Sequence, residues 1–559
     1  MLLFLFFLLT NYSLVNAQNK GYVIGVDKLF VDANDPLYKQ VKPGDTIYFS
    51  AGSRKYINVS NFQGSAVQPI IMINSGGDVI IDTDHYYGIT IQNCRYIKFT
   101  GSGSPGQFYG FKVKRVSKGA GLSMGYLSSD IEIDHISIEN TLIGGLYAKT
   151  DPDCDPNTVR SAFTQFNTVI HDNYIANTGD EGMYVGSTKY FGQTVKCNGK
   201  DTLLMPSLLD GVKIYNNILK YTGWDGIQVS SASKNCQVFD NTILYDSQDN
   251  EDTQMSGILI GGGTKCDCYN NFISQGNGDG IECLGLGGTR IYNNIILDAG
   301  LSYFPNDQTK MKYGIYVNDT SVEKDSSFYL VHNNIIHPKS DGIRFSSTLS
   351  KGNFISSNVI INPGSYDYYE NGNTSFKGKD SYIMFQSEAS VATVSNNYAE
   401  RDASSAGFVS LKMDSPPDFK LVKGSPLIDA VDYHAKTAVA FDFNYFPRPY
   451  GTKSDIGAWE CDIPTSAAPI PITTVDKQNW LLRNPVSDLL TICFKTVPDQ
   501  ESILEICNLQ GVLERRIEVS KMQFGHQQIE VNVAGLPGGV YLYLLRSKKT
   551  SYSGKFIKL

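Results

Sequence analysis

Acidic residues recur immediately before a Gly-Ile or Gly-Met pair along the 559-residue chain, at Glu181, Asp225, Asp279 and Asp341. Two neighbouring carboxyl groups can act as acid and base in the cleavage of a glycosidic bond, or can bind sugar hydroxyls. Asp180, Glu181 and Asp225 are the best candidates for this chemistry. An Asp before Gly is also an ordinary turn residue, so the pattern fits a purely structural role as well.

A second group of carboxylates lies in the run Asp151-Pro152-Asp153-Cys154-Asp155. Oxygen ligands at alternating positions could hold Ca²⁺, which makes Asp151, Asp153 and Asp155 candidate calcium ligands, although Asp-Pro runs are also common in loops. The sequence has no CxxC pair and no His cluster with the spacing of structural zinc. Calcium is therefore the one cofactor that the sequence suggests.

A short phrase ending in Asn recurs through the chain and indicates the elements that must position these groups. Equivalent Asn residues lie 23 residues apart (Asn271 to Asn294) or 24 residues apart (Asn217 to Asn241) at the shortest spacings. A unit of this length with three short strands cannot bury its apolar face alone, so it must stack on its neighbours. We expect a parallel solenoid of about ten turns with one column of stacked Asn residues: Asn173, Asn217, Asn241, Asn271, Asn294 and Asn334.

These repeats resemble those of right-handed parallel β-helix proteins of the pectate-lyase-like superfamily. The resemblance covers about Gly21 to Glu460, from the opening Lys42-Pro43-Gly44-Asp45-Thr46-Ile47 to the closing Asp455-Ile456-Gly457-Ala458-Trp459-Glu460. It implies an all-β fold in which residues 18–461 form a right-handed parallel β-helix with capping segments. It also implies that the outer face of the strand carrying the Gly-Ile phrase forms a polysaccharide groove.

Period-two alternation identifies the residues on that outer face, because Ile227 and Val229 must point inward. The outward positions are Tyr147, Tyr184, Gln228, Leu259, Glu282, Tyr316 and Arg344, and Trp224 lies next to Asp225. Long insertions at 150–169, 187–210, 247–255 and 301–312 flank this strand on both sides, which predicts a cleft. Tyr and Trp rings in a cleft can stack on sugars, although a Tyr ladder can also stabilise stacked strands without any ligand.

The resemblance leaves the reaction open. A lyase of this superfamily would need a cation and a base, commonly Lys or Arg, and Lys149 and Arg160 flank the acidic run. The segment Asn177-Thr178-Gly179-Asp180-Glu181-Gly182 is loosely similar to an acidic motif of polygalacturonases, but the Gly-His-Gly and Arg-Ile-Lys motifs of that family are missing. The candidates are a polysaccharide lyase, a glycosidase, and a surface protein that binds glycans or mediates adhesion without catalysis.

Ten cysteines in an exported chain allow disulfides. Cys154 and Cys197 lie in two consecutive long insertions and could tie them together. Cys236 and Cys266 each lie five residues before a column Asn, so stacked turns would bring their Cα atoms within disulfide range. A stack of buried thiols would fit the same spacing.

The two ends of the chain carry transport signals. Residues 1–17 have the apolar run and the Val15-Asn16-Ala17 cleavage site of a signal peptide. Residues 462–480 read as a linker, and residues 481–559 predict a small β-sandwich that resembles the C-terminal sorting domain of the type IX secretion system. The motifs are Asn484-Pro485-Val486-Ser487-Asp488, Leu536-Pro537-Gly538-Gly539-Val540-Tyr541-Leu542 and Gly554-Lys555-Phe556-Ile557-Lys558-Leu559. The resemblance implies recognition by that machinery and a secreted or outer-membrane surface location.

Composition excludes other classes of function. A net charge of −8 does not fit a general nucleic-acid binder, and a hydrophobic content of 41% excludes global disorder. Outside the signal peptide no stretch of 18 apolar residues predicts a transmembrane helix. Gly261-Gly262-Gly263 lacks the helix and Lys-Thr of a nucleotide-binding loop.

Overall fold

The computed structural model describes residues 20–307, 309–364, 367–370, 373–377, 382–432, 434–446 and 448–461 and, near the C-terminus, 479–481, 486, 489–494, 501–508, 513–520, 528–547 and 551–558. The predicted signal peptide and residues 462–478 of the predicted linker lie outside these ranges. The chain divides into two compact units, residues 1–402 and 403–559. The predicted boundary of the β-helix domain at residue 461 remains a prediction.

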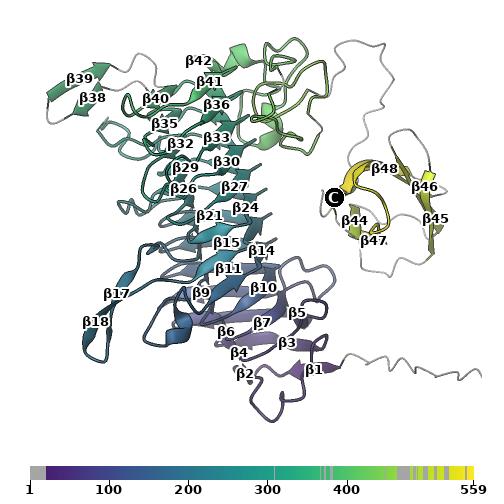
Figure 1. Ribbon diagram of the computed structural model, residues 1–559. Helices are drawn as coiled ribbons and strands as arrows, with labels where there is room; N and C mark the ends of the chain where they lie inside the picture. The colour runs from purple at the N-terminus through teal and green to yellow at the C-terminus, as the bar shows by residue number, and fades with distance from the viewer. Residues whose placement is uncertain are drawn as a thin grey trace, which may run out of the picture. The chain divides into compact units, whose positions relative to one another are not determined.

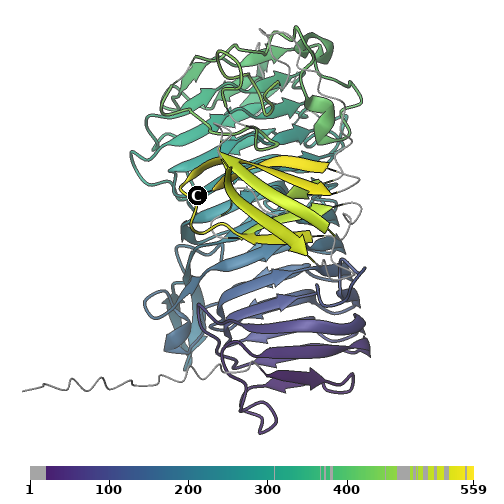
Figure 2. The same cartoon turned by 90° about the vertical axis from the view of Figure 1, so that its right-hand side faces the viewer.

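The first unit is an all-β solenoid in which short strands stack in parallel from rung to rung (Figures 1 and 2). Its twelve-stranded sheet takes one strand from each rung, so the described solenoid has twelve rungs instead of about ten. The strands are β2 (Phe30–Asp32), β4 (Ile57–Ser60), β6 (Tyr87–Gln92), β9 (Ala120–Gly125), β12 (Leu146–Ala148), β16 (Met183–Val185), β22 (Ile227–Val229), β26 (Ser256–Ile260), β29 (Asp279–Cys283), β32 (Ile315–Val317), β35 (Ile343–Phe345) and β40 (Ile383–Phe385).

A 23-stranded sheet forms the remaining walls of the solenoid. The strands before β12 are β1 (Gly21–Ile24), β3 (Thr46–Arg54), β5 (Ile70–Thr83), β7 (Arg95–Thr100), β8 (Phe111–Val116), β10 (Ser129–Asp134) and β11 (Ile136–Thr141). Those that follow are β14 (Thr168–His171), β15 (Tyr174–Thr178), β20 (Lys213–Tyr215), β21 (Ile218–Thr222), β24 (Cys236–Phe239), β25 (Thr242–Leu244), β27 (Cys266–Tyr269), β28 (Phe272–Ser274), β30 (Thr289–Tyr292), β31 (Ile295–Leu297), β33 (Phe328–Val331), β34 (Asn334–Ile336), β36 (Phe354–Ser356), β37 (Val359–Ile361), β41 (Thr393–Ser395) and β42 (Tyr398–Glu400).

The insertions add short elements at the edges of the solenoid. A three-stranded sheet combines β13 (Thr164–Phe166), β19 (Leu208–Asp210) and β23 (Ala232–Lys234), next to the 3-10 helix η1 (Pro156–Thr158). The hairpin of β17 (Gln193–Cys197) and β18 (Lys200–Leu204) projects from the stacked rungs (Figure 1). A second hairpin pairs β38 (Asp367–Glu370) with β39 (Asn373–Lys377).

Stacked Asn side chains join consecutive rungs at one turn. Asn241 shows the pattern: its Nδ2 donates to Oδ1 of Asn271 at 3.0 Å, and its Oδ1 accepts from Nδ2 of Asn217 at 3.0 Å. Each buried amide thus bonds the rung above and the rung below. The described column comprises Asn173, Asn217, Asn241, Asn271, Asn294, Asn333, Asn358 and Asn397.

The prediction of Asn334 in this column is wrong by one residue. Val331 pairs with Tyr292, so His332 takes the left-handed turn position of Asn293 and Asn333 takes the place of Asn294. Asn334 instead begins β34. The repeated phrase is shifted by one residue in this rung, and two adjacent Asn residues conceal the shift in the sequence.

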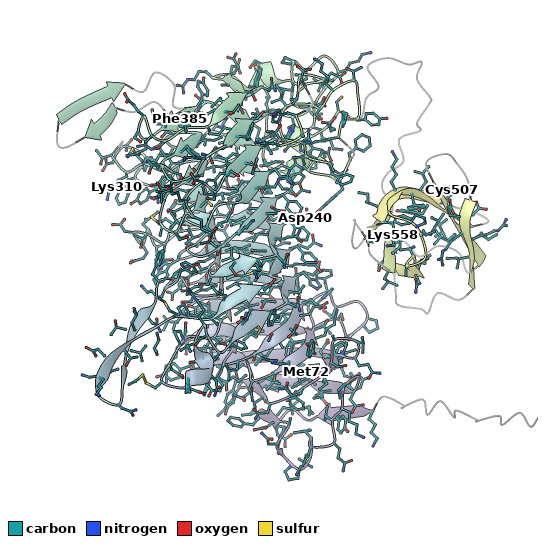
Figure 3. All side chains as sticks on the ribbon, in the orientation of Figure 1. Met72, Asp240, Lys310, Phe385, Cys507 and Lys558 are labelled. Carbon is teal, nitrogen blue, oxygen red and sulfur yellow. A yellow bond between two sulfur atoms is a disulfide. The ribbon has the colours of Figure 1, made fainter. Side chains whose placement is uncertain are left out.

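The interior is packed with aliphatic and aromatic side chains from Ile24 to Ile360. Figure 3 shows how densely these side chains fill the rungs between Met72 and Phe385. Close stacking also explains the glycine of the acidic phrase: a Cβ on Gly182 would lie 2.6 Å from the Gly226 carbonyl oxygen, and one on Gly226 would lie 2.5 Å from the Gly257 carbonyl oxygen. Glycine therefore allows neighbouring rungs to approach at the turn that carries Glu181 and Asp225.

The second unit contains the 3-10 helices η2 (Ala403–Ala406) and η3 (Pro416–Phe419), followed by a region held by a buried Arg448–Glu460 ion pair at 2.6 Å. Its C-terminal part has two antiparallel sheets, as the predicted small β-sandwich requires. Apolar residues of both sheets, among them Leu490, Leu504 and Phe556, form its core. The strands are β43 (Asn479–Leu481), β44 (Leu489–Phe494) and β47 (Gln528–Asn532) in one sheet, and β45 (Glu501–Asn508), β46 (Leu513–Ser520), β48 (Gly539–Ser547) and β49 (Ser551–Lys558) in the other.

Candidate functional site

The register of the twelve-stranded sheet aligns the predicted outward residues in one continuous strip, here called the outer column. Its members are Tyr147, Tyr184, Gln228, Leu259, Glu282, Tyr316 and Arg344. Tyr147, Tyr184, Glu282 and Tyr316 are half-buried, whereas Gln228 and Arg344 are only 1% and 4% exposed. The strip is therefore partly covered, and its accessible positions are the tyrosines and Glu282.

Asp180 and Glu181 share one hydroxyl donor at the start of β16. The Tyr147 hydroxyl donates to Oδ2 of Asp180 at 3.4 Å and to Oε2 of Glu181 at 3.5 Å. Glu181 is 2% exposed, and burial raises its pKa to about 7. Burial also raises the pKa of the more exposed Asp180. Two candidate catalytic carboxyl groups thus adjoin each other, and one of them is substantially protonated near neutral pH.

Asp225 lies one rung further along and is fully buried. Neither of its carboxylate oxygens has a side-chain hydrogen-bond partner among the described residues, and the nearby backbone N–H of Ser256 stabilises its charged form only in part. Burial raises its pKa well above the usual value, and the charges of Glu282, Glu181 and Asp246 raise it further. The half-buried Trp224 precedes it, and the Trp224 backbone N–H donates to the Asp180 carbonyl oxygen at 3.1 Å. The structure therefore brings all three predicted catalytic carboxyl groups to one corner of neighbouring rungs.

Further acidic groups continue this corner. Oε2 of Glu282 accepts from the Ser256 hydroxyl at 3.1 Å, and burial together with the charge of Asp279 raises the Glu282 pKa to about 7. Burial raises the pKa of Asp246 to about 6. We call Asp180, Glu181, Asp225, Asp246, Asp279 and Glu282 the acidic centre. The sequence analysis did not identify Asp246, because it follows β25 and lies outside the acidic phrase. Its position within the repeat was the only feature of the sequence that could have placed it near Asp225.

Lys149 adjoins the acidic centre as a charged ammonium. Its Nζ lies 4.1 Å from the Tyr184 ring centroid and 3.1 Å from Oδ1 of Asp151. Burial alone would lower its pKa, but Tyr184 and Asp151 outweigh burial and raise it. Arg160 instead fixes an insertion, because its guanidinium donates to the carbonyl oxygens of Pro206 at 3.2 Å and Tyr190 at 2.5 Å. The structure does not bring Arg160 into the acidic centre by any described contact.

Arg344, at the far end of the outer column, already has partners. Its Nη1 lies 3.1 Å from Oδ2 of Asp341, and its Nε donates to Oε1 of Gln386 at 3.0 Å.

Figure 3 shows Lys310, from the 301–312 insertion, and Asp240, beside the Asn column, on opposite sides of the solenoid in that view. That insertion therefore lies away from the Asn column.

Two family descriptions match separate parts of the chain. Residues 207–381 match the description "Right handed beta helix region", and residues 484–559 match "Secretion system C-terminal sorting domain". The protein is a right-handed β-helix with a C-terminal secretion sorting domain. No curated relative matches its sequence. The predicted handedness and sorting domain are confirmed.

Solved structures similar to this β-helix protein include several carbohydrate-active enzymes. Pectate lyase Pel9A has 13% identity and a TM-score of 0.44, with 80% of this chain and 97% of that chain covered. A GH136 lacto-N-biosidase from Eubacterium ramulus has 13% identity and a TM-score of 0.40, with 68% of each chain covered. The PL6 family polysaccharide lyase Pedsa3628 from Pseudopedobacter saltans has 14% identity and a TM-score of 0.28, with 66% of this chain and 92% of that chain covered.

The sorting domain of this β-helix protein indicates transport by the type IX secretion system to the cell surface or the medium. Of its three predicted motifs, 536–542 and all of 554–559 except the last residue lie on described residues, while most of 484–488 lies outside them. Within the ranges that the structure describes, no helix combines the length and apolar character needed to cross a bilayer.

The structure does not gather the predicted calcium ligands of the β-helix. Oδ1 of Asp153 accepts from the backbone N–H of Asp155 and from the Thr158 hydroxyl, and Oδ2 of Asp155 accepts from the Tyr126 hydroxyl at 2.8 Å. Asp151 pairs with Lys149. Local hydrogen bonds therefore satisfy these carboxylates, as expected for an ordinary Asp-Pro loop.

The structure instead brings Glu132, Asp134 and His171 together on the 23-stranded sheet, with ligand atoms within 4.8 Å of one another. The Lys98 ammonium already lies among them, 2.7 Å from Oε1 of Glu132 and 3.2 Å from Oδ2 of Asp134. Nδ1 of His171 lies 2.6 Å from Oδ2 of Asp172. A metal ion at this cluster would have to displace the lysine.

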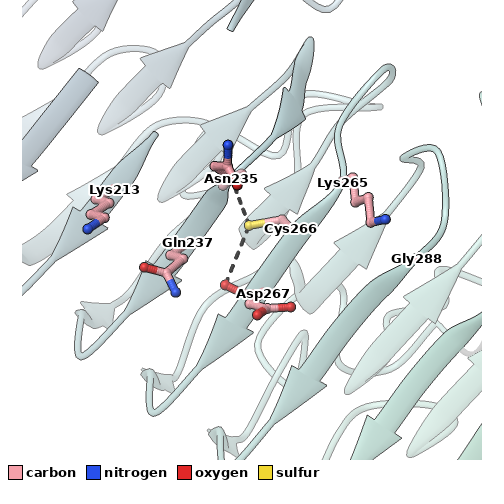
Figure 4. Close-up of a pocket in the computed structure, with 8 residues that line it drawn as sticks. Lys213, Asn235, Gln237, Lys265, Cys266, Asp267 and Gly288 are labelled. Atoms are coloured by element: carbon pink, nitrogen blue, oxygen red, sulfur yellow. Dashed lines mark hydrogen bonds between the residues drawn. The ribbon is translucent and has the colours of Figure 1, made fainter. Parts of the chain in front are cut away.

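The structure places the members of both candidate cysteine pairs next to each other. Cys154 and Cys197 form a disulfide with a Cα–Cα distance of 5.5 Å, which ties the segment around η1 to the β17–β18 hairpin. Cys236 pairs in register with Cys266, and the two buried thiols have their Sγ atoms 2.9 Å apart. They line a pocket of about 440 Å³, beside the aligned side chains of Lys213, Gln237 and Asp267 (Figure 4).

Proposed function

We propose that this secreted β-helix protein hydrolyses glycosidic bonds of a polysaccharide in a groove along the outer column, with Glu181 as the proton donor. Its raised pKa supports the proposal, because a carboxyl group with a pKa of about 7 is both protonated and acidic enough to act as a general acid near neutral pH. The Tyr147 hydroxyl holds Glu181 beside Asp180, which supplies the second carboxyl group.

Asp225 has a different place in this proposal. It is fully buried, so its carboxyl group lies behind the surface that a polymer would contact first. Burial raises its pKa well above the usual value and so favours the protonated form, which can donate as well as accept a hydrogen bond when a sugar hydroxyl or a water molecule enters the site. We therefore assign Asp225 to substrate positioning and Asp180 with Glu181 to acid–base chemistry.

Hydrolysis fits the basic residues better than elimination by a lyase. An eliminating base must be uncharged before it removes a proton, and the ion pair and ring contact of Lys149 favour its charged form. Arg160 is committed to the carbonyl oxygens of its own insertion. Neither group therefore supports elimination at this site.

Non-catalytic glycan binding is the second candidate, favoured by the half-buried aromatic rings of Tyr147, Tyr184, Trp224 and Tyr316. Aromatic stacking contributes about 1 kcal/mol per ring, so affinity would accumulate along an extended polymer. Tyr184→Ala and Trp224→Ala should each weaken glycan binding several-fold in isothermal titration. Unchanged affinity in both variants would show that the glycan binds elsewhere.

Turnover separates the two candidates. The full chain is incubated with acidic and neutral polysaccharides, with and without added Ca²⁺, and its products are analysed. New reducing ends without unsaturated ends support hydrolysis, unsaturated ends indicate a lyase, and binding without products supports the second candidate. Glu181→Gln should abolish cleavage and preserve binding, while Glu388→Gln, at an exposed position, should leave both unchanged.

A further inference from the structure

A pocket of about 350 Å³ lies at the turns that follow β34 and β37. Both turns open with a residue in the left-handed region and then Pro, at His337-Pro338 and Asn362-Pro363. The His337 backbone N–H donates to the Ile361 carbonyl oxygen at 2.9 Å, so the two turns stack in adjacent rungs. Leu301, Lys339 and Arg401 also line the pocket. No lining residue belongs to the outer column or to the acidic centre.

Two cations line this pocket, and neither has a carboxylate partner among the described residues. The Lys339 ammonium donates to two backbone carbonyl oxygens of the 301–312 insertion, and the Arg401 guanidinium donates to the Pro363 carbonyl oxygen. The acidic residues on either side of Arg401 in the sequence form no ion pair with it. A neutral carbonyl oxygen satisfies an N–H group without cancelling the positive charge, and both side chains keep further N–H donors. The pocket wall therefore carries two uncompensated positive charges.

Two lysines of the neighbouring insertion add to this positive charge. The ammonium groups of Lys312 and Lys339 lie 5.6 Å and 5.3 Å from the centroid of the same ring, that of Tyr303. Burial lowers the pKa of Lys339, and the charges of Lys312 and Lys310 lower it further. Lys312 is partly compensated, because its Nζ lies 3.9 Å from Oδ2 of Asp279. The cations are therefore close enough to repel one another.

The carboxylates near the pocket have other partners. Oδ1 of Asp307 accepts from the Thr309 hydroxyl at 2.7 Å and from its backbone N–H at 2.9 Å. Oδ1 of Asp298 lies 3.4 Å from Nδ1 of His337. The charge of Asp307 raises the pKa of Lys339, but burial outweighs it and the pKa remains lowered. An anion that enters the pocket would supply the missing counter-charge.

The rest of the lining indicates what carries that anion. Charged N–H donors form their strongest hydrogen bonds with oxyanions such as carboxylates and sulfate esters. The Asn362 amide can bond a hydroxyl group, and Leu301, Pro338 and Pro363 offer an apolar wall to the C–H face of a sugar ring. The volume of about 350 Å³ is at the lower end for small-molecule sites, which suits a short stretch of a glycan.

We propose that this pocket binds a sugar unit that carries an oxyanion, either a carboxylate or a sulfate ester, through Lys339 and Arg401. The inference goes beyond the proposed function, because the pocket lies outside the outer column and its ligand need not be cleaved. A glycan bound there holds the protein on an acidic polymer whatever bond the groove acts on.

Binding of three matched polymers to the full chain tests the site. Isothermal titration at low salt compares dextran, carboxymethyl-dextran and dextran sulfate of equal length, which share one backbone and differ in the anionic group. We expect at least one anionic polymer to bind about tenfold tighter than dextran, and the tighter of the two identifies the oxyanion. The net charge of −8 opposes non-specific attraction of a polyanion, so tight binding requires a local site.

Variants of the two cations test the residues themselves. Lys339→Gln and Arg401→Gln each remove one charge and should each weaken binding of the favoured anionic polymer about tenfold, with dextran binding unchanged. Arg401 is exposed, so its substitution leaves the packing of the rungs intact. Lys55→Gln removes the same charge at an exposed position near the N-terminal end of the solenoid and should have no effect.

Four results would overturn the inference. They are equal binding of all three polymers by the wild type, binding of neither anionic polymer, undiminished binding by the folded double variant of Lys339 and Arg401, and an equal loss of affinity in Lys55→Gln. The third result would place the anion elsewhere on the chain, and the fourth would show that binding follows overall charge alone.

The proposed function fails by a different observation. A chain that binds the anionic polymer through Lys339 and Arg401 but releases no reducing ends from any polysaccharide retains the pocket and loses the hydrolytic role. A chain that hydrolyses a polysaccharide but binds neither anionic polymer retains hydrolysis and contradicts the pocket. Affinity in the cation variants and product release are therefore independent readouts.

Discussion

Replacing Glu181 by Gln should stabilise the β-helix at alkaline pH while it removes turnover. Burial raises the pKa of Glu181 from the ordinary 4.5 to about 7, and at about 1.4 kcal/mol per pKa unit this corresponds to about 3 kcal/mol. For an acid whose pKa is raised on folding, the stabilising contribution is fully present below the unfolded pKa. It is lost as the pH rises through the folded pKa of about 7.

The assay is urea unfolding of the full chain, followed by circular dichroism at pH values from about 4 to about 8, a range that spans both pKa values. Because Gln cannot ionise, the free energy of unfolding of Glu181→Gln relative to wild type should rise by about 3 kcal/mol over this range. Glu388→Gln, an exposed control, should show no such trend. A stability difference that is the same at every pH would refute the desolvated carboxyl group on which the catalytic role depends.

Three further predictions concern the scaffold and transport. Asn241→Ala removes hydrogen bonds to Ile214 and to both neighbouring column residues, and should lower the free energy of unfolding by about 3 kcal/mol. The control Asn306→Ala, at an exposed position, should change the free energy of unfolding by under about 0.5 kcal/mol. Equal effects of the two substitutions in chemical denaturation would contradict the contribution of the Asn column to stability. Cys236 and Cys266, with Sγ atoms 2.9 Å apart, should be disulfide-linked in the exported protein, and two alkylatable thiols in non-reducing peptide mapping would rule this out. Deletion of residues 481–559 should leave the protein in the periplasm, and its normal appearance on the surface or in the medium by immunoblotting would disprove the sorting role.

The geometry of the outer column could be predicted from the sequence because one physical rule controls it. Apolar side chains fill the solenoid core behind these strands, so Ile227 and Val229 fix the direction of Gln228, and parallel stacking repeats that choice in every rung. The number of rungs was harder to predict. The strands from β2 to β9 belong to rungs outside the described Asn column, which begins at Asn173, so the repeat offered no signal there.

The properties of the site depended on packing that the sequence does not reveal. The sequence pattern of an acidic residue before Gly is the same whether its carboxyl group is exposed to solvent or buried. Only the structure shows that Glu181 and Asp225 are buried. The run from Asp151 to Asp155 has plausible calcium spacing, yet its side chains turn to local donors. The wrong placement of Asn334 in the Asn column has a similar cause. Asn333 and Asn334 are identical neighbours, so only the pairing of the strands shows which of them lies in the column.

The most direct test of the account is product analysis, in heavy-oxygen water, of whichever polysaccharide the wild-type chain cleaves, with uronate-containing polymers included in the panel and new reducing ends trapped by immediate reduction. Hydrolysis in the groove predicts products that carry the heavy oxygen at their new reducing ends with the wild-type chain, and no labelled products with Glu181→Gln. Unlabelled products with unsaturated ends, or labelled products at the wild-type rate from the folded Glu181→Gln chain, would contradict acid-catalysed hydrolysis by this carboxyl group.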